Sequence, residues 1–179
     1  MVVKRVAGAL GAELQAVNLG DELDTKLART LHALLNKHEV LFLRDQNIEP
    51  AAQKALAEIF GPLQTHPAYN TVEGLPEVMV LESTRENPSK IEVWHSDMTF
   101  RQHPPSVTVL RGITIPEVGG DTLFASMTAA YDGLSLGMQR YLDGLIAVHD
   151  FSHGFKESLA EHGGRERLAD AVAANPPVR

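Results

Sequence analysis

Leucines recur at spacings of three and four along residues 23–35, which is the hydrophobic period of one face of an α-helix. Asp21 and Asp24 stand near the start of this run, and either side chain suits a helix N-cap. The continuous apolar run VLFL, residues 40–43, predicts a short buried strand. We expect the leucine face to pack in the core rather than to carry function.

A second helix is predicted over residues 50–60, with Pro50 in its first turn and Gly61 just past its end. Two further segments, 127–145 and 156–174, carry the helical period, and a pair of glycines interrupts the second one. These helices account for the beginning and the end of the chain.

The middle of the chain has the composition of strands. Short apolar runs, separated by Gly, Pro and Asn, predict strands over 78–81, 93–100, 107–115 and 122–125. Strands and helices do not alternate regularly, which favours an α+β fold, largely antiparallel or barrel-like, over a doubly wound sheet.

The composition limits the classes of function that the chain can have. The 179 residues are 44% hydrophobic and 22% charged, as expected for a single globular domain spanning 1–179. The net charge of −7, with 16 basic residues scattered among 23 acidic ones, argues against a nucleic-acid partner. There are 0 cysteines, so thiolate chemistry is excluded and any metal must be bound by His, carboxylate or water.

The N-terminal apolar run resembles a targeting segment only superficially, because Glu13 and Gln15 interrupt it. No run reaches the roughly 18 to 20 apolar residues that span a bilayer. We therefore expect a cytoplasmic protein without a membrane partner.

The stretch VWHSDMTF contains a candidate metal site. Alternate side chains of a strand share one face, so His95 and Asp97 are predicted to point the same way. One imidazole, one carboxylate and a further His form the triad that binds Fe(II) and leaves three positions open. Taken alone, the pair is also compatible with a surface His beside a turn Asp.

The longer run WHSDMTFRQHPPSVTVLRGITIPEVGGDT resembles the taurine dioxygenase family of Fe(II)- and 2-oxoglutarate-dependent oxygenases. In that family a Trp-His-x-Asp-x-(Ser/Thr)-Phe motif is followed by a Pro-Pro strand and a Gly-Gly-Asp-Thr turn. The resemblance extends upstream through HEVLFLRDQNI and FGPLQTHPAYN and downstream through AVHDFSHGF to NPPVR. It thus covers essentially the whole chain.

The resemblance implies a double-stranded β-helix, or jelly roll, with flanking helices. It implies that His95 and Asp97 hold Fe(II) and act in catalysis, and that Thr122 binds a carboxylate of 2-oxoglutarate. Without the flanking match, a turn hydroxyl bonded to local backbone would explain Thr122 equally well. The chemistry would use O2 to hydroxylate a small anionic molecule.

The same resemblance assigns His66 and Tyr69, from HPAY, to a sulfonate pocket, and Phe155 to its apolar wall. Both polar side chains can donate to sulfonate oxygens. The alternative is a Pro-bounded surface loop with a packed Tyr, and a Phe that is plain core.

Two departures from the family pattern matter. Before Trp94 the family presents a polar Asp/Asn stretch suited to an amine, whereas this chain reads KIEV over residues 90–93. Ile91 cannot form a hydrogen bond through its side chain, so a sulfonate or sulfate ester without an amine fits at least as well as taurine.

The second departure concerns the third metal ligand and the Arg residues that bind 2-oxoglutarate. The family places them in a segment absent from this chain, so we expect 1–179 to be the N-terminal two-thirds of a longer domain, lacking the C-terminal strands. His149, His153 and His162 are weaker candidates for the third ligand. Without these strands the sheet would have open edges. Because unpaired strand edges invite association, we expect a homo-oligomer.

The reading that combines these observations is a dioxygenase that releases sulfite or sulfate and an aldehyde. One alternative keeps the chemistry but acts on another small carboxylate, such as an aryloxyacetate or a modified amino acid. Another is a non-catalytic jelly-roll fragment. A zinc enzyme on a cupin-like barrel would need a third protein ligand that the sequence does not reveal.

Overall fold

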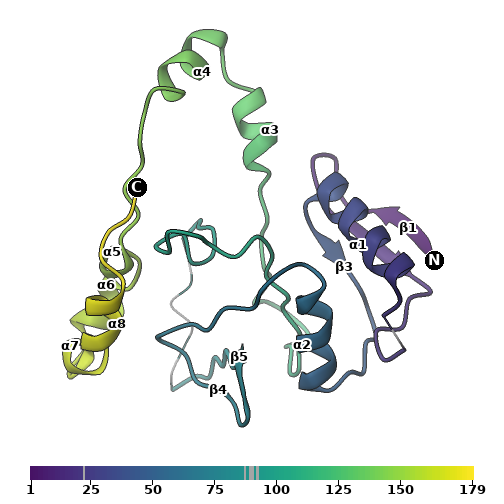
Figure 1. Cartoon of the computed structure of the whole chain (residues 1–179), viewed down its shortest axis with the longest axis horizontal. Helices are drawn as coiled ribbons and strands as arrows, with labels where there is room; N and C mark the ends of the chain where they lie inside the picture. Colours follow the sequence, from purple (N-terminus) through teal and green to yellow (C-terminus); the bar gives the residue numbers. More distant parts are fainter. Residues whose placement is uncertain (22, 87, 89–90, 92) are drawn as a thin grey trace. The chain divides into compact units, whose positions relative to one another are not determined.

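The computed structural model (Figure 1) describes residues 1–21, 23–86, 88, 91 and 93–179. Within them the chain forms two compact units, and each unit combines two separate stretches of sequence. The first unit consists of Met1–Phe60 and Val109–Leu145, and the second of Gly61–Thr108 and Ile146–Arg179. Each unit contains its own hydrophobic cluster.

The first unit starts with a three-stranded sheet in the order β1-β2-β3. Its strands are β1 (Val2–Arg5), β2 (Ala12–Gln15) and β3 (Leu41–Phe42). β1 and β2 are antiparallel, whereas β2 and β3 are parallel and are therefore joined by a helical crossover. Ala12 and Leu14 are buried while Gln15 is exposed, so β2 turns one face to the core. The β1–β2 hairpin is an element that the sequence analysis did not predict.

The crossover helix α1 (Thr25–His38) forms where the leucine period predicts it. Asp24 is the N-cap, and its carboxylate accepts a hydrogen bond from the Leu27 backbone N–H at 2.6 Å. Helix α2 (Pro50–Glu58) likewise matches its prediction, with Pro50 at the start of the helix. Proline is tolerated there because the first helical N–H groups have no partner within the helix.

The core of the first unit lies between these helices and the sheet. It consists of Leu14, Leu19, Leu31, Ile48 and Leu56. Gln46, which follows β3, binds the segment that follows β2: its side chain accepts from the Leu19 N–H at 2.8 Å and donates to the Val17 carbonyl at 3.0 Å. Apolar packing and the bridging amide of Gln46 thus both contribute to the stability of this unit.

The second stretch of the first unit carries helices α3 (Met127–Asp132) and α4 (Leu136–Leu142). Serine caps each of them: Ser126 accepts from the Ala129 N–H and Ser135 from the Met138 N–H. Ser126 also donates to Glu39 at 2.9 Å, which links the start of α3 to the end of α1. The predicted helical period over 127–145 is confirmed as two short helices.

The second unit contains the hairpin β4 (Thr71–Val72) and β5 (Leu75–Met79) and four short C-terminal helices. The helices are α5 (Phe151–Gly154), α6 (Lys156–Ala160), α7 (Gly164–Arg167) and α8 (Ala169–Ala174). An isolated antiparallel bridge joins His149 to Val178. The buried cluster of this unit is Met98, Phe100, Phe151 and Ala171.

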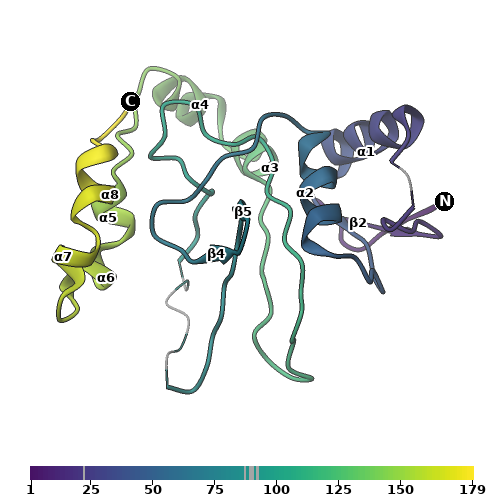
Figure 2. The same ribbon diagram turned by 60° about the horizontal axis from the view of Figure 1, so that its bottom comes forward.

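The strand predictions for the middle of the chain are largely wrong. In the part of the chain that the structure describes, residues 93–100, 107–115 and 122–125 form no strand, and Figure 2 draws the stretch before α3 without an arrow. Apolar runs become strands only when a neighbouring strand takes up their backbone hydrogen bonds, and these runs have no ladder partner among the described residues. The prediction over 78–81 is met in part by β5, and that over 40–43 by β3, which is half-buried rather than buried.

None of the helices in the described ranges has the length and apolarity needed to cross a membrane.

Candidate active site

The predicted metal-binding pair lies in the second unit, on irregular backbone that becomes a turn at Asp97. His95 Nε2 lies 3.3 Å from Asp97 Oδ1, and the two side chains are 47% and 48% exposed. Met98, buried in the turn, has a φ of 50°, a conformation uncommon for a residue other than glycine. The expectation that a strand aligns the pair is wrong, because the turn brings the two side chains together instead.

The tautomer of His95 follows from its backbone contact. His95 Nδ1 lies 2.9 Å from the carbonyl oxygen of Val93, which can only accept, so Nδ1 carries the proton. Nε2, the other ring nitrogen, faces Asp97. A neutral imidazole with its remote nitrogen bonded to a carbonyl is the form in which histidine binds metal.

Asp97 is held from its other side. The Thr108 hydroxyl donates to Asp97 Oδ2 at 2.7 Å, which leaves Oδ1 facing His95. One nitrogen and one carboxylate oxygen therefore converge, each with the remote atom of its own side chain hydrogen-bonded. Such a donor set suits a divalent cation of the Fe(II) or Mn(II) class.

The three residues predicted to line a substrate pocket lie together in the same unit. The ring centroids of His66 and Tyr69 are 4.5 Å apart, and the ring of Phe155 lies 5.5 Å from His66 and 6.2 Å from Tyr69. His66 and Phe155 are 89 positions apart in the sequence, yet the three residues form one aromatic cluster. Their assignment to a substrate stays a prediction.

The base of this cluster is apolar and buried. Phe151 is 0% exposed, stacks on Phe155 at 4.5 Å and meets Phe100 edge-on at 5.0 Å. Phe100 in turn lies edge-on to His66 at 5.8 Å. Since Phe100 ends the turn that begins at Asp97, the same turn supports both the His95–Asp97 pair and the aromatic cluster.

Burial and charge set the protonation of the two polar rings. The pKa of His66 falls from 6.5 to about 4, chiefly because burial disfavours its charged form and also because Arg101 is near, while Asp97 opposes the shift. Burial and then the charge of Asp97 raise the pKa of Tyr69. At neutral pH the cluster therefore presents a neutral imidazole and a protonated phenol.

The proton of the neutral His66 ring sits on a defined nitrogen. The backbone N–H of Ala68 donates to His66 Nδ1 at 3.1 Å, so Nδ1 is the acceptor and Nε2 bears the hydrogen. His66 Nε2 and Tyr69 Oη are thus two neutral hydrogen-bond donors on one half-buried face.

The remaining predicted residues are not gathered at this site. Thr122 belongs to the first unit, where it is exposed in the stretch before α3, and its predicted role stays a prediction. His149 lies in the isolated bridge, His153 in α5 and His162 just before α7. Among the described residues no three His, Asp or Glu side chains are grouped to hold a metal ion.

The segment before Trp94, where the sequence departs from the family pattern, is described only in part. Lys90 and Glu92 lie outside the described residues. Ile91 and Val93 are 50% and 75% exposed. Neither side chain can donate or accept a hydrogen bond.

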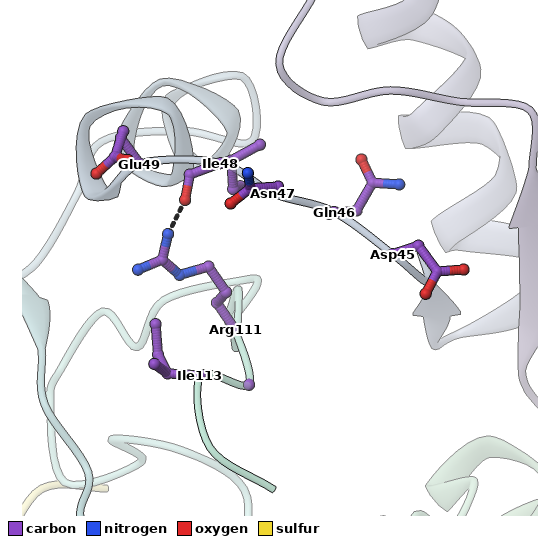
Figure 3. Close-up of a pocket in the computed structure, with 8 residues that line it drawn as sticks. Asp45, Gln46, Asn47, Ile48, Glu49, Arg111 and Ile113 are labelled. Carbon is purple, nitrogen blue, oxygen red and sulfur yellow. Dashed lines mark hydrogen bonds between the residues drawn. The ribbon is translucent and has the colours of Figure 1, made fainter.

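A pocket of about 580 Å³ lies in the first unit, between the loop before α2 and residues 111–113 (Figure 3). Its lining is Asp45, Gln46, Asn47, Ile48, Glu49, Arg111, Gly112 and Ile113. The guanidinium of Arg111 points to the carbonyl oxygen of Ile48 and donates to it (Figure 3). The pocket contains none of the predicted site residues.

Two residues next to the candidate site, Thr108 and Arg101, were not predicted from the sequence. The sequence could have indicated Thr108: if residues 93–115 form a hairpin with its turn at 102–103, Thr108 lies opposite Asp97. No pattern pointed to Arg101, because its effect on His66 depends on the loop at 65–66, to which it donates a hydrogen bond at 3.3 Å.

Sequence comparison with curated proteins finds relatives that act on sulfur compounds. The chain is 32% identical to an alkylsulfatase of Acinetobacter baylyi, over 93% of this chain and 53% of that protein. It is 32% identical to an α-ketoglutarate-dependent sulfate ester dioxygenase of Pseudomonas putida, over 86% of this chain and 50% of that protein. The chain thus spans about half the length of these relatives.

Solved structures agree. A taurine dioxygenase from Burkholderia xenovorans superimposes with a TM-score of 0.73 at 35% identity, over 84% of this chain and 53% of that chain. AAD-2, in complex with Mn(II) and N-oxalylglycine, matches with a TM-score of 0.69 at 23% identity over 99% of this chain and 62% of that one, which shows the fold alone. The family model for the taurine catabolism dioxygenase TauD, TfdA family matches residues 3–179. The resemblance seen in the sequence motifs is therefore confirmed, and the chain belongs to the TauD, TfdA family.

Proposed function

We propose that the protein is an Fe(II)- and 2-oxoglutarate-dependent dioxygenase that acts on a sulfate ester or sulfonate. Hydroxylation of the carbon that bears the sulfur group gives an unstable product, which collapses to an aldehyde and releases sulfate or sulfite. The observation that carries the proposal is the convergence of His95 Nε2 and Asp97 Oδ1 at 3.3 Å on the turn that also supports the His66 cluster.

The donor set fits the metal. A neutral imidazole nitrogen and a carboxylate oxygen are two of the three ligands of a facial Fe(II) site, and both are accessible here. When bound, Fe(II) with 2-oxoglutarate and O2 supplies the oxidising equivalent for the C–H bond, while 2-oxoglutarate becomes succinate and carbon dioxide. The protein's own part is to hold the two ligand atoms in place and to position the substrate.

The aromatic cluster is suited to the anionic end of such a substrate. His66 Nε2–H and the Tyr69 hydroxyl donate hydrogen bonds without adding charge, and Phe155 offers an apolar wall beside them. Neutral donors bind a sulfonate or sulfate oxygen while the buried rings exclude water. Ile91, standing where the family pattern is polar, favours an alkyl sulfate over taurine, whose amine would need a polar partner.

The wider fold and the cosubstrate site complete the proposal. We place the chain in a double-stranded β-helix, supported by its likeness to taurine dioxygenase structures. Thr122, the last residue of the Gly-Gly-Asp-Thr segment, whose two glycines have positive φ, is the proposed partner of a 2-oxoglutarate carboxylate.

The test is a coupled assay on the full chain with Fe(II), ascorbate, oxygen and 2-oxoglutarate. Three substrates are offered separately: a linear alkyl sulfate, taurine and an aryloxyacetate. We expect succinate to form in step with sulfate released from the alkyl sulfate. Coupling to the aryloxyacetate alone would move the proposal to carboxylate substrates, and no succinate with any of them would indicate a non-catalytic fold.

Variants connect the activity to the site. His95→Ala and Asp97→Ala should reduce coupled sulfate release to background, because each removes a metal ligand. His103→Ala is the matched control. His103 is an exposed loop histidine that accepts a hydrogen bond from Gln64 through its backbone carbonyl, which the substitution keeps. Equal activity of His95→Ala and His103→Ala would contradict the proposed metal site.

A further inference from the structure

The hydrogen bond between Thr108 and Asp97 selects which carboxylate oxygen faces His95. We propose that Thr108 is a positioning residue, which fixes Asp97 in the orientation that binds the metal. The inference rests on the proposed function, because it assigns to Thr108 a role toward the metal proposed at His95 and Asp97.

The geometry gives the bond a direction. A carboxylate only accepts, so the Thr108 hydroxyl donates to Asp97 Oδ2 at 2.7 Å. The terminal torsion of an aspartate is broad and twofold, so without a partner the two oxygens exchange places readily. With Oδ2 bonded, Oδ1 is the oxygen that lies 3.3 Å from His95 Nε2.

The arrangement mirrors the one at His95. There the Val93 carbonyl holds the remote nitrogen Nδ1 at 2.9 Å and leaves Nε2 free to bind. Each ligand is thus held through the atom that does not face its partner. Groups that orient metal ligands in this way typically contribute 10- to 100-fold to metal affinity, because the ligands are ordered before the ion arrives.

A purely structural role for Thr108 does not explain the arrangement, since its side chain is exposed and the bond joins two exposed groups. Exposed hydrogen bonds contribute little to the stability of a fold, because water replaces them. Removing the hydroxyl should therefore change metal binding much more than it changes unfolding.

The experiment measures Mn(II) binding to the full chain without oxygen, by electron paramagnetic resonance and by calorimetry. Thr108→Val removes the hydroxyl and keeps the shape of the side chain. Thr108→Ala removes the hydroxyl without placing a methyl group beside Asp97, and Thr108→Ser keeps the hydroxyl. Thr114→Val is the matched control, an exposed threonine of the first unit. Thermal unfolding of every variant is recorded alongside.

We expect Thr108→Val and Thr108→Ala to weaken Mn(II) binding by about 10- to 100-fold, and Thr108→Ser and Thr114→Val to bind like the wild type. The line shape of bound Mn(II) in the electron paramagnetic resonance spectrum should change in the variants that lose affinity. If His95→Ala abolishes binding but Thr108→Val and Thr108→Ala leave it intact, the role of Thr108 is wrong and the metal site stands. If the wild type and His95→Ala bind Mn(II) equally, or neither binds, the proposed function itself fails.

Discussion

At the scale of single residues, the most informative side chain is His66, whose charge is controlled by its surroundings. Its pKa of about 4, below the ordinary 6.5, means that the folded protein keeps this ring neutral where an unfolded chain would protonate it. Between pH 6.5 and 4 the unfolded state therefore binds the extra proton, and the free energy of unfolding falls as the pH falls through this window.

We predict a titration midpoint for His66 near pH 4, measured from the ring C–H resonances by NMR and assigned with the His66→Gln variant. The same variant should lose part of the acid-dependent destabilisation between pH 6.5 and 4, measured by urea unfolding at several pH values. A midpoint at 6.5 or above would show that the ring is neither buried nor close to Arg101.

Arg101 contributes to this shift through its positive charge. We predict that Arg101→Met raises the pKa of His66, because it removes the charge while keeping an apolar side chain beside Phe100, whose ring the guanidinium lies over. The pKa should stay below 6.5, since burial is the larger cause. NMR titration measures the change. Arg140→Met should leave the midpoint where it is, because the charges that shift the pKa of His66 are those of Arg101 and Asp97.

At the scale of elements, local sequence signals predicted the helices and failed for the strands. Helices α1 and α2 follow from the leucine spacing and from Pro50, all of which act within a few residues. Strands depend on partners distant in sequence, so the apolar run over 107–115 could not reveal that it lacks a ladder partner among the described residues. The same difference between local and distant signals holds at the site. A local motif located His95, whereas the effect of Arg101 on His66 depends on its contact with the distant loop at 65–66.

The cap of α1 provides a prediction at this scale. Asp24, rather than Asp21, accepts the Leu27 N–H. Asp24→Ala should lower the free energy of unfolding by about 1 kcal/mol, the usual contribution of an N-cap side chain. Urea unfolding measures it. Asp21→Ala, which loses only an exposed side-chain hydrogen bond with Asn18, should have a smaller effect, and the reverse order would contradict the capping geometry.

At the scale of the whole molecule, each unit is closed by two stretches that are far apart in the sequence. In the first unit Arg111 reaches the Ile48 carbonyl, and in the second the backbone of His149 pairs with Val178. Patterns of three or four residues carry no information about such closures. The family match over residues 3–179 does, because it relates the chain to folds already known.

The described surface also carries large apolar side chains, and they lead to the last prediction. Ile113, Ile115 and Leu123 are 74%, 72% and 72% exposed, all within the stretch before α3. Large apolar side chains exposed to water favour association, which buries their surface. We therefore predict that the chain forms oligomers in a concentration-dependent manner, measured by sedimentation velocity, and that it binds the dye ANS.

Replacing two of these side chains tests the cause. Ile113→Ser with Ile115→Ser should reduce both the dye fluorescence and the oligomer fraction, because the driving force scales with the apolar area removed from water. Thr114→Ser, between the two positions, is the matched control and should change neither. A wild-type chain that stays monomeric at every concentration and binds no dye would mean that these side chains are covered in solution, and the homo-oligomer predicted from the sequence would then lose its physical basis.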